Sequence, residues 1–311
     1  MKVVGWVLAA VGAVAMLILL VFMVGSGLHG RSTLTIAIST FIPLIWIPAA
    51  ITLLGLLLVV QKWGRWLLAA LIALLLGVVG YLAMPKEHEP VPDPQVSMLM
   101  LNVQYGRADV EQLLPHIKAA DILIFVEYTP AFQEGLRQAG VMEAFPHQEG
   151  SVREDAGGTM ILSRTPLELV GMTEGTPFDN VLARTSIDGV EWHVLGAHPS
   201  PPHFGGEQWE ADASALVDLF SPHQPERLVA AGDFNAIRQH STMQLLTGPD
   251  LLNSAHSGAG WTPTWPMNSI IPPFAQIDHV LVSPRVVVER PRRIVVDGTD
   301  HAGFTFRVAS S

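Results

Sequence analysis

The sequence predicts an α/β layered domain carried on a membrane anchor of three transmembrane helices. Residues 3–84 are almost wholly apolar, and their only charged side chains are Arg31, Lys62 and Arg65. From residue 96 onward, short β-branched or apolar runs alternate with amphipathic stretches and turn residues, as in strands with helices between them. We therefore expect an anchor over residues 1–84, a linker over 85–95 and an α/β domain over 96–311.

Three apolar stretches in the anchor are long enough to cross a bilayer, which takes roughly 20 residues. They cover residues 3–24, 34–60 and 66–84, and Pro43 and Pro48 predict a kink in the second. A cleavable signal peptide accounts only for the first stretch. Buried helices of a soluble protein are the alternative, but the lengths favour an integral protein of the cell membrane.

The few charges of the anchor predict its orientation. Lys2 precedes the first span, Lys62 and Arg65 lie between the second and third, and Arg31 stands alone in the first loop. Lys and Arg accumulate on the cytoplasmic side, so we expect the α/β domain outside the cytoplasm. The chain has no cysteine, which suits an oxidising exterior.

The linker and the acidic balance narrow the choice of partners. Residues 85–94 contain four prolines, which favour an extended spacer. All 28 acidic residues follow Lys86, and an acidic surface disfavours a general nucleic-acid binder. A bound divalent cation reverses the sign of the charge locally, so phosphoester substrates stay open.

The α/β domain is read as six strands and two helices. The strands are expected at residues 97–103, 122–126, 159–162, 193–197, 228–231 and 277–282. The helices are expected at residues 109–119 and 206–220, where apolar residues recur every three and four positions. Polar residues follow these strands, where active sites are usually assembled.

The tetrapeptide Gly-Asp-Phe-Asn after the apolar run 228–231 is the most informative of these strand ends. Side chains alternate along a strand, so Asp233 and Asn235 are expected to face one site. A carboxylate base beside an amide donor suits phosphoester hydrolysis. A simple turn is the alternative, because Gly, Asp and Asn are common turn residues.

Polar residues stand at the other strand ends as well: Asn102, Glu127, His198, Asp278, Asp300 and His301. Most have a structural alternative, such as a turn cap for Asn102 or a hydrogen-bonded histidine for His198. Asp278 differs, because it interrupts a strand that continues through apolar residues.

Taken in order, these segments resemble the endonuclease/exonuclease/phosphatase superfamily, which includes deoxyribonuclease I-like nucleases, sphingomyelinases and inositol phosphatases. The matching segments are residues 101–103, 125–127, 158–164, 196–199, 232–235, 277–280 and 299–301. The resemblance implies a four-layer sandwich, in which two β-sheets pack face to face with helices outside, and a metal-assisted hydrolysis.

The resemblance also implies a metal site. Glu127 is the principal Mg²⁺ ligand expected from it, with Asn102 and Asp300 in or near the coordination sphere. Hard oxygen ligands suit Mg²⁺ or Mn²⁺, and the lack of cysteine argues against a thiolate zinc site.

The catalytic roles follow from the same resemblance. Asp233 is expected to orient or deprotonate the attacking water, and Asn235 to hold a phosphoryl oxygen. His301 is expected to contact the scissile phosphate, kept in its tautomer and partly charged by Asp278, while His198 adds a second donor.

The sequence thus predicts a membrane-anchored, divalent-metal-dependent phosphoesterase that contacts membrane lipid through its helices. Its substrate is a phosphodiester, in a nucleic acid or in a phospholipid headgroup as in sphingomyelinases, and no protein partner is evident. The loop around Trp261 and Trp265 either stacks a base, contacts lipid or packs on the domain. A non-catalytic scaffold on the same fold is disfavoured, because the main metal and imidazole positions are present.

Overall fold

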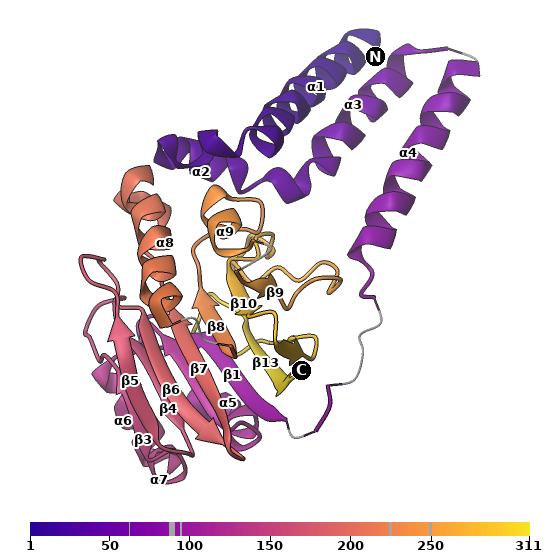
Figure 1. Ribbon diagram of the computed structural model, residues 1–311. Coiled ribbons are helices and arrows are strands. Elements are labelled where there is room, and N and C mark those ends of the chain that lie inside the picture. The colour runs from indigo at the N-terminus through magenta and orange to yellow at the C-terminus, as the bar shows by residue number, and fades with distance from the viewer. Residues whose placement is uncertain (62, 87–90, 94, 224–225, 249–250) are drawn as a thin grey trace.

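The computed structural model describes residues 1–61, 63–86, 91–93, 95–223, 226–248 and 251–311. Residues 87–90 and 94 of the predicted linker, and Lys62 of the predicted cytoplasmic loop, lie outside the described residues. Figure 1 shows a helical N-terminal part above a C-terminal domain built on β-sheets.

Two mixed sheets form the C-terminal domain. The order of the first is β11 (Val286–Val288), β13 (Gly303–Ser310), β1 (Val96–Asn102), β2 (Ile122–Val126), β4 (Thr159–Ser163) and β3 (His147–Gly150), and β12 (Arg292–Ile294) also pairs with β13. The order of the second is β5 (Leu167–Met172), β6 (Val181–Ile187), β7 (Val190–Ala197), β8 (Leu228–Asp233), β10 (Asp278–Val282) and β9 (Asn253–Ser254).

The central strands are largely apolar because they are buried on both faces, and in β2 every residue is apolar and buried. In β1, Met98 and Met100 enter the core between the sheets, whereas Leu99 and Leu101 face outward. That outer face is covered by α5 (Val110–Lys118), α6 (Pro130–Gln138) and α7 (Val141–Ala144).

Helices α8 (Gly206–Phe220) and α9 (Ser241–Leu246) cover the outer face of the second sheet. The domain is therefore the predicted four-layer sandwich, and the fold prediction is confirmed (Figure 1). The six predicted strands and both predicted helices are present.

The N-terminal part contains α1 (Lys2–Val24), α3 (Trp46–Val59) and α4 (Trp63–Ala83). Of the described helices, α1 and α4 are each long and apolar enough to cross a membrane. The second predicted span is not one continuous helix, so the count of three is inexact. It is broken into α2 (Thr33–Ser39), a 3₁₀ turn at Ile42–Leu44 and α3, with a bend of 67°.

The break has a local cause. Pro43 lies within the 3₁₀ turn, where it has no N–H for a helical hydrogen bond. Just before it, the side chains of Ser39 and Thr40 bond back to the carbonyl of Ile36. Hydroxyls bound in this way compete with the helical ladder and favour a bend.

Helices α1 and α3 pack closely through small residues. A side chain at Gly5 would collide with the carbonyl oxygen of Gly55, and one at Gly55 would collide with the backbone of Ala9. Small residues spaced four apart let membrane helices approach in this way.

Helix α2 lies against the C-terminal domain rather than within the helical hairpin (Figure 1). Ile36 is fully buried in the cluster beneath α8, together with Trp209. Thr33 Oγ1 donates to the carbonyl of Pro202 at 3.0 Å, and Ser39 Oγ lies 3.0 Å from His240 Nε2. Both ends of this short helix are thus attached to the domain.

Candidate active site

Pairing of the strands gathers the predicted polar residues at one edge of the sandwich. Strands β1 and β2 run parallel, so Asn102 and the residue after β2, Glu127, reach the same edge. In the second sheet Asp278 pairs directly with Asp233. Strand β7 ends at Ala197, beside Gly232, so the next residue, His198, lies near Asp233. Glu127, His198 and Asp233 line a pocket of about 710 Å³, whereas Asn102 and Asp278 do not line it.

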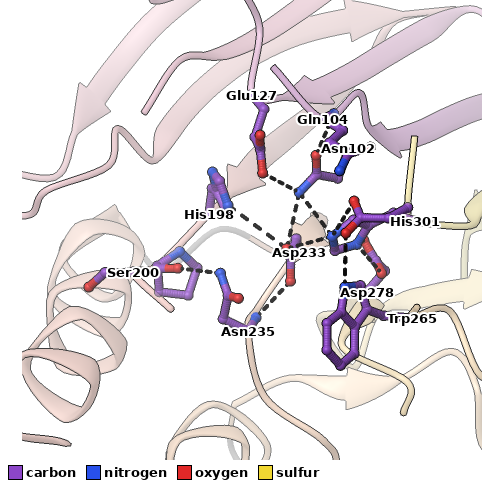
Figure 2. A network of polar contacts seen from close by, with 12 residues as sticks. Asn102, Gln104, Glu127, His198, Ser200, Asp233, Asn235, Trp265, Asp278 and His301 are labelled. Atoms are coloured by element: carbon purple, nitrogen blue, oxygen red, sulfur yellow. Dashed lines mark hydrogen bonds and ion pairs between the residues drawn. The ribbon is translucent and has the colours of Figure 1, made fainter. Parts of the chain in front are cut away.

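Asp233 is the centre of the polar network (Figure 2). Its Oδ2 accepts a hydrogen bond from Asn102 Nδ2 at 3.1 Å and lies 3.7 Å from His301 Nε2 and 3.9 Å from His198 Nε2. Burial raises the pKa of Asp233, His301 opposes the rise, and Asp278 adds to it. The raised pKa makes this carboxylate a stronger base than an ordinary aspartate.

A glycine allows this placement. Gly232 immediately precedes Asp233, and a side chain there would collide with the carbonyl oxygen of Ala197 in β7. The close approach of the two strands brings Asp233 within reach of His198, which follows Ala197.

Asp278 and His301 form a buried pair. His301 Nδ1 donates to Asp278 Oδ2 at 3.0 Å, which leaves Nε2 directed at Asp233 and 3.8 Å from Asp300 Oδ1. Burial lowers the pKa of His301, but the carboxylates of Asp278 and Asp233 outweigh it and raise the pKa to about 10. The imidazole is therefore positively charged at neutral pH, which strengthens the hydrogen bonds that it can donate to a phosphate.

Glu127 stands beside this pair on the first sheet. Its backbone is left-handed, with φ of 59°, which turns the side chain into the pocket at the end of β2. Asn102 Nδ2 donates to Oε1 at 3.0 Å and the Tyr105 N–H donates to Oε2 at 2.8 Å. Burial raises the pKa of Glu127, and no Lys or Arg among the described residues forms an ion pair with it.

These side chains fit a hard divalent cation. Glu127 and Asp233 line the pocket, whereas Asp300 does not line it but has its Oδ1 3.8 Å from His301 Nε2. His301 is the positive group beside these carboxylates. Buried carboxylates need counter-charge, which a divalent cation supplies. Oxygen ligands suit Mg²⁺ or Mn²⁺. Asp233, Asp278 and His301 also have potential ligand atoms within 4.8 Å of one another, but the Asp278–His301 bond already occupies two of them.

The remaining predicted residues lie where the strands lead them, with two differences in detail. Asn102 Oδ1 accepts from the Gln104 N–H at 2.9 Å, so the amide presents its donor to the carboxylates. Asn235 shares the pocket with Asp233, but the argument from strand alternation is wrong. Strand β8 ends at Asp233, and Asn235 lies in a turn with φ of 49°, where its Nδ2 donates to the Pro199 carbonyl at 2.9 Å.

His198 lies on the opposite side of Asp233 from His301 (Figure 2). Its ring stacks on Phe178 with centroids 4.7 Å apart. Burial lowers the pKa of His198 to about 4, although Asp233 opposes the shift. It is thus a neutral imidazole, which can donate one hydrogen bond without adding charge.

Several supporting residues escaped the sequence analysis. The His198 N–H donates to Asn180 Oδ1, and Thr299 Oγ1 donates to the Asn102 carbonyl at 2.8 Å. Thr299 directly precedes Asp300 and His301, and its supporting role could have been predicted, because a hydroxyl at a turn often bonds to nearby backbone. Asn180 lies in a loop without a pattern. Helix α2, which also lines the pocket, was assigned to a membrane span.

Comparison with known proteins agrees with this arrangement. The family model described as Endonuclease/Exonuclease/phosphatase family matches residues 101–301, which include every predicted site residue. No curated protein sequence matches the chain.

Solved structures share the fold of the C-terminal domain. The TDP2 protein of D. rerio, complexed with a single-strand DNA product, is 16% identical with a TM-score of 0.57, over 70% of this chain and 100% of that one. A Bacteroides vulgatus endonuclease/exonuclease/phosphatase gives the same identity, score and coverage. The human Nocturnin catalytic domain with bound sulfate is 17% identical with a TM-score of 0.51, over 71% of this chain and 97% of that one.

Proposed function

Because the chain belongs to the endonuclease/exonuclease/phosphatase family, whose members hydrolyse phosphate esters, we propose that it is a membrane-anchored, divalent-metal-dependent phosphodiesterase. The observation that carries the proposal is the convergence of Glu127, Asp233 and His301 on one pocket from both sheets. Its substrates are phosphodiesters of a nucleic acid or a phospholipid headgroup.

The side chains divide the reaction between them. Asp233 orients the attacking water and accepts its proton as the new P–O bond forms and the ester P–O bond breaks. The charged His301 and the neutral His198, both within 4 Å of Asp233, bind the phosphoryl oxygens as negative charge develops. Asn235 lines the same pocket and is proposed to add a hydrogen bond to a phosphoryl oxygen.

The metal ligands are proposed to be Glu127 and Asp300, and Asn102 holds Glu127 and Asp233 in place by its two donated bonds. A bound Mg²⁺ or Mn²⁺ supplies positive charge to the phosphoryl oxygens. Trp265 Nε1 donates to Asp300 Oδ2 at 3.2 Å and orients that carboxylate. Outer contacts of this kind fix the direction of metal ligands.

The position of α2 constrains how the proposed anchor crosses the membrane. Because α2 contacts the C-terminal domain, both lie on the same side of the bilayer. Between them the chain passes through α3 and α4, so it crosses the membrane an even number of times there. A crossing by α4 alone would separate α2 from the domain. We therefore propose three crossings, by α1, by α3 with its preceding 3₁₀ turn, and by α4.

The positively charged loop before α4 favours a cytoplasmic position for that loop and an extracytoplasmic one for the catalytic domain. Arg65 adds a positive charge in the first turn of α4, at the same end of that helix.

The proposal is tested with the full chain in lipid nanodiscs and Mg²⁺ or Mn²⁺. The substrates are bis-p-nitrophenyl phosphate, plasmid DNA and sphingomyelin. We expect hydrolysis of at least one of them, dependent on the metal. Absence of hydrolysis of all three across both metals contradicts the proposal.

A further inference from the structure

Helix α2 forms one wall of the catalytic pocket. Thr33, Ala37, Thr40 and Phe41, all from the segment between the first two membrane helices, line the same pocket as Asp233. Ala37 is exposed toward the pocket, whereas its neighbour Ile36 is buried on the opposite side against α8. The anchor therefore contributes directly to the surface that meets the substrate.

The pocket wall away from the polar cluster is apolar. Phe41 of the α2 segment stacks on Phe274 with ring centroids 5.2 Å apart and an angle of 4° between the rings. Phe274 in turn packs edge-on against Trp265. Phe178 packs edge-on against Phe204, and both rings line the same pocket. An apolar surface of this kind next to a phosphate-binding cluster suits a ligand with a charged head and an apolar body.

The charges lining the pocket disfavour a long polyanion. None of the lining residues in the described part of the chain is a lysine or arginine, and the chain as a whole carries a net charge of −10. Nucleic acids bind chiefly through cations that neutralise successive phosphates. Apart from His301, which is proposed to bind the scissile phosphate, the described residues that line this pocket include no row of cations for further phosphates.

The apolar wall continues toward the membrane helices. Phe274 also lines a second cavity of about 180 Å³, together with Pro43 and Trp261. Pro43 and Trp261 line a third, of about 620 Å³, whose other walls come from α1, α3 and α4. The three cavities therefore share lining residues in sequence, from the catalytic cluster to the space between α1, α3 and α4.

We propose that the substrate is a membrane phospholipid, whose phosphodiester binds at the Asp233–His301 cluster while its apolar chain lies against α2 and Phe274. This inference rests on the proposed phosphodiesterase function and names its substrate class. Ala37 and Phe41 then determine specificity for the chain, although neither belongs to the catalytic cluster. The bilayer is the source of the substrate because α2 joins two membrane helices.

The test uses full-length protein in nanodiscs and a series of p-nitrophenyl alkyl phosphates, from methyl to octyl, with Mg²⁺. Each buried methylene is expected to raise kcat/KM by up to roughly fourfold, the equivalent of its transfer from water. Ala37→Trp fills the wall and should flatten the dependence of kcat/KM on chain length. Leu34→Trp, on the exposed side of the same helix, is the matched control and should behave as wild type.

The outcomes separate the inference from the function beneath it. If the methyl diester is hydrolysed but chain length has the same effect in wild type and Ala37→Trp, the lipid inference is wrong and the phosphodiesterase stands. If no diester is hydrolysed, the proposed function fails. Equilibrium binding of the intact diesters then decides the inference, since a chain-length dependence lost in Ala37→Trp supports it and an unchanged one overturns it.

Discussion

At the scale of single residues, the site depends on a carboxylate held between two imidazoles of different charge. His301 is positive because Asp278 and Asp233 raise its pKa to about 10, and His198 is neutral because burial lowers its pKa to about 4. One imidazole thus provides charge and the other a neutral donor, although both are the same residue type. The resemblance predicted these residues and a partial charge on His301 from Asp278, but not the neutral state of His198, which depends on burial.

Replacement of Asp278 by Asn is expected to reduce kcat about 10²- to 10⁴-fold with little change in melting temperature. The amide has the same shape but no charge, so His301 loses the group that fixes its tautomer and its positive charge. Asp188→Asn, at an exposed turn, is the control for loss of a carboxylate. Steady-state kinetics with bis-p-nitrophenyl phosphate measures the effect, and an unchanged kcat contradicts the role given to Asp278.

Glu127→Gln is expected to abolish stabilisation by the metal without harming the metal-free fold. Burial raises the pKa of Glu127, so the folded protein disfavours the charge. Removal of the charge offsets the one hydrogen bond, from Asn102 or Tyr105, that the amide nitrogen of Gln cannot accept. Metal at about a hundredfold excess over its Kd stabilises the wild type by about 2.7 kcal/mol.

The measurement is the melting temperature with EDTA and with increasing Mg²⁺. We expect a rise of several degrees in the wild type and little in Glu127→Gln. An equal rise in both proteins shows that Glu127 is not a ligand.

At the scale of elements, the strands were readable from the sequence and α2 was not. Strands β1, β2 and β8 are largely apolar because they are buried on both faces, so the polar residues at or just after their ends stand out. Strand β5 is half-exposed at an edge and carries a weaker pattern. Helix α2 lies within an apolar stretch of the sequence that is long enough for a membrane span, and its contact with α8 shows that it packs on the domain instead. Local composition cannot reveal a partner so distant in the sequence.

His240 links α2 to the domain and makes this contact sensitive to pH. Its Nδ1 accepts from the Ile237 N–H at 3.1 Å, so Nε2 carries the proton and donates to Ser39. Burial, with smaller contributions from His29 and His279, lowers its pKa to about 3. Trp209 of α8 packs edge-on against the ring and is uncharged.

Acidification is therefore expected to destabilise the protein partly through His240. Below the ordinary pKa of about 6.5 the unfolded chain takes up a proton that folded His240 does not, so stability falls progressively between about pH 6.5 and about pH 3. By about pH 5 the loss at this residue is about 1–2 kcal/mol.

The measurement compares melting temperatures at about pH 7.5 and about pH 5 for wild type, His240→Asn and the exposed control His203→Asn. Other buried histidines contribute equally to all three, so the difference between variants isolates His240. The wild type and His203→Asn should lose more stability on acidification than His240→Asn. Equal losses contradict the role of His240.

At the scale of the whole molecule, the contact between α2 and the catalytic domain constrains the membrane topology. The sequence predicted three spans from length and charge, and the described helices include two that meet the length on their own. The bent second segment gives the same topology if α2 lies at the surface and α3 crosses. The catalytic pocket then faces the bilayer surface from which its proposed substrate comes.

Because the chain has no cysteine, single cysteines report this topology directly. Asp188→Cys on the catalytic domain is expected to react with a membrane-impermeant maleimide on intact cells. Gln61→Cys, at the end of α3, should react only after permeabilisation. The opposite pattern reverses the orientation, and labelling of both on intact cells contradicts three crossings.

The proposed function depends on activation of water by Asp233 at a metal-dependent phosphodiesterase site. Its direct test is the steady-state rate of bis-p-nitrophenyl phosphate hydrolysis by full-length protein in nanodiscs. The rate is compared between wild type and Asp233→Asn, with Mg²⁺ and with EDTA. We expect turnover only in the wild type with Mg²⁺, and a loss of about 10³-fold or more in Asp233→Asn, whose folding is confirmed by its melting temperature. Equal rates in the two proteins, or a wild-type rate indifferent to EDTA, contradict the account.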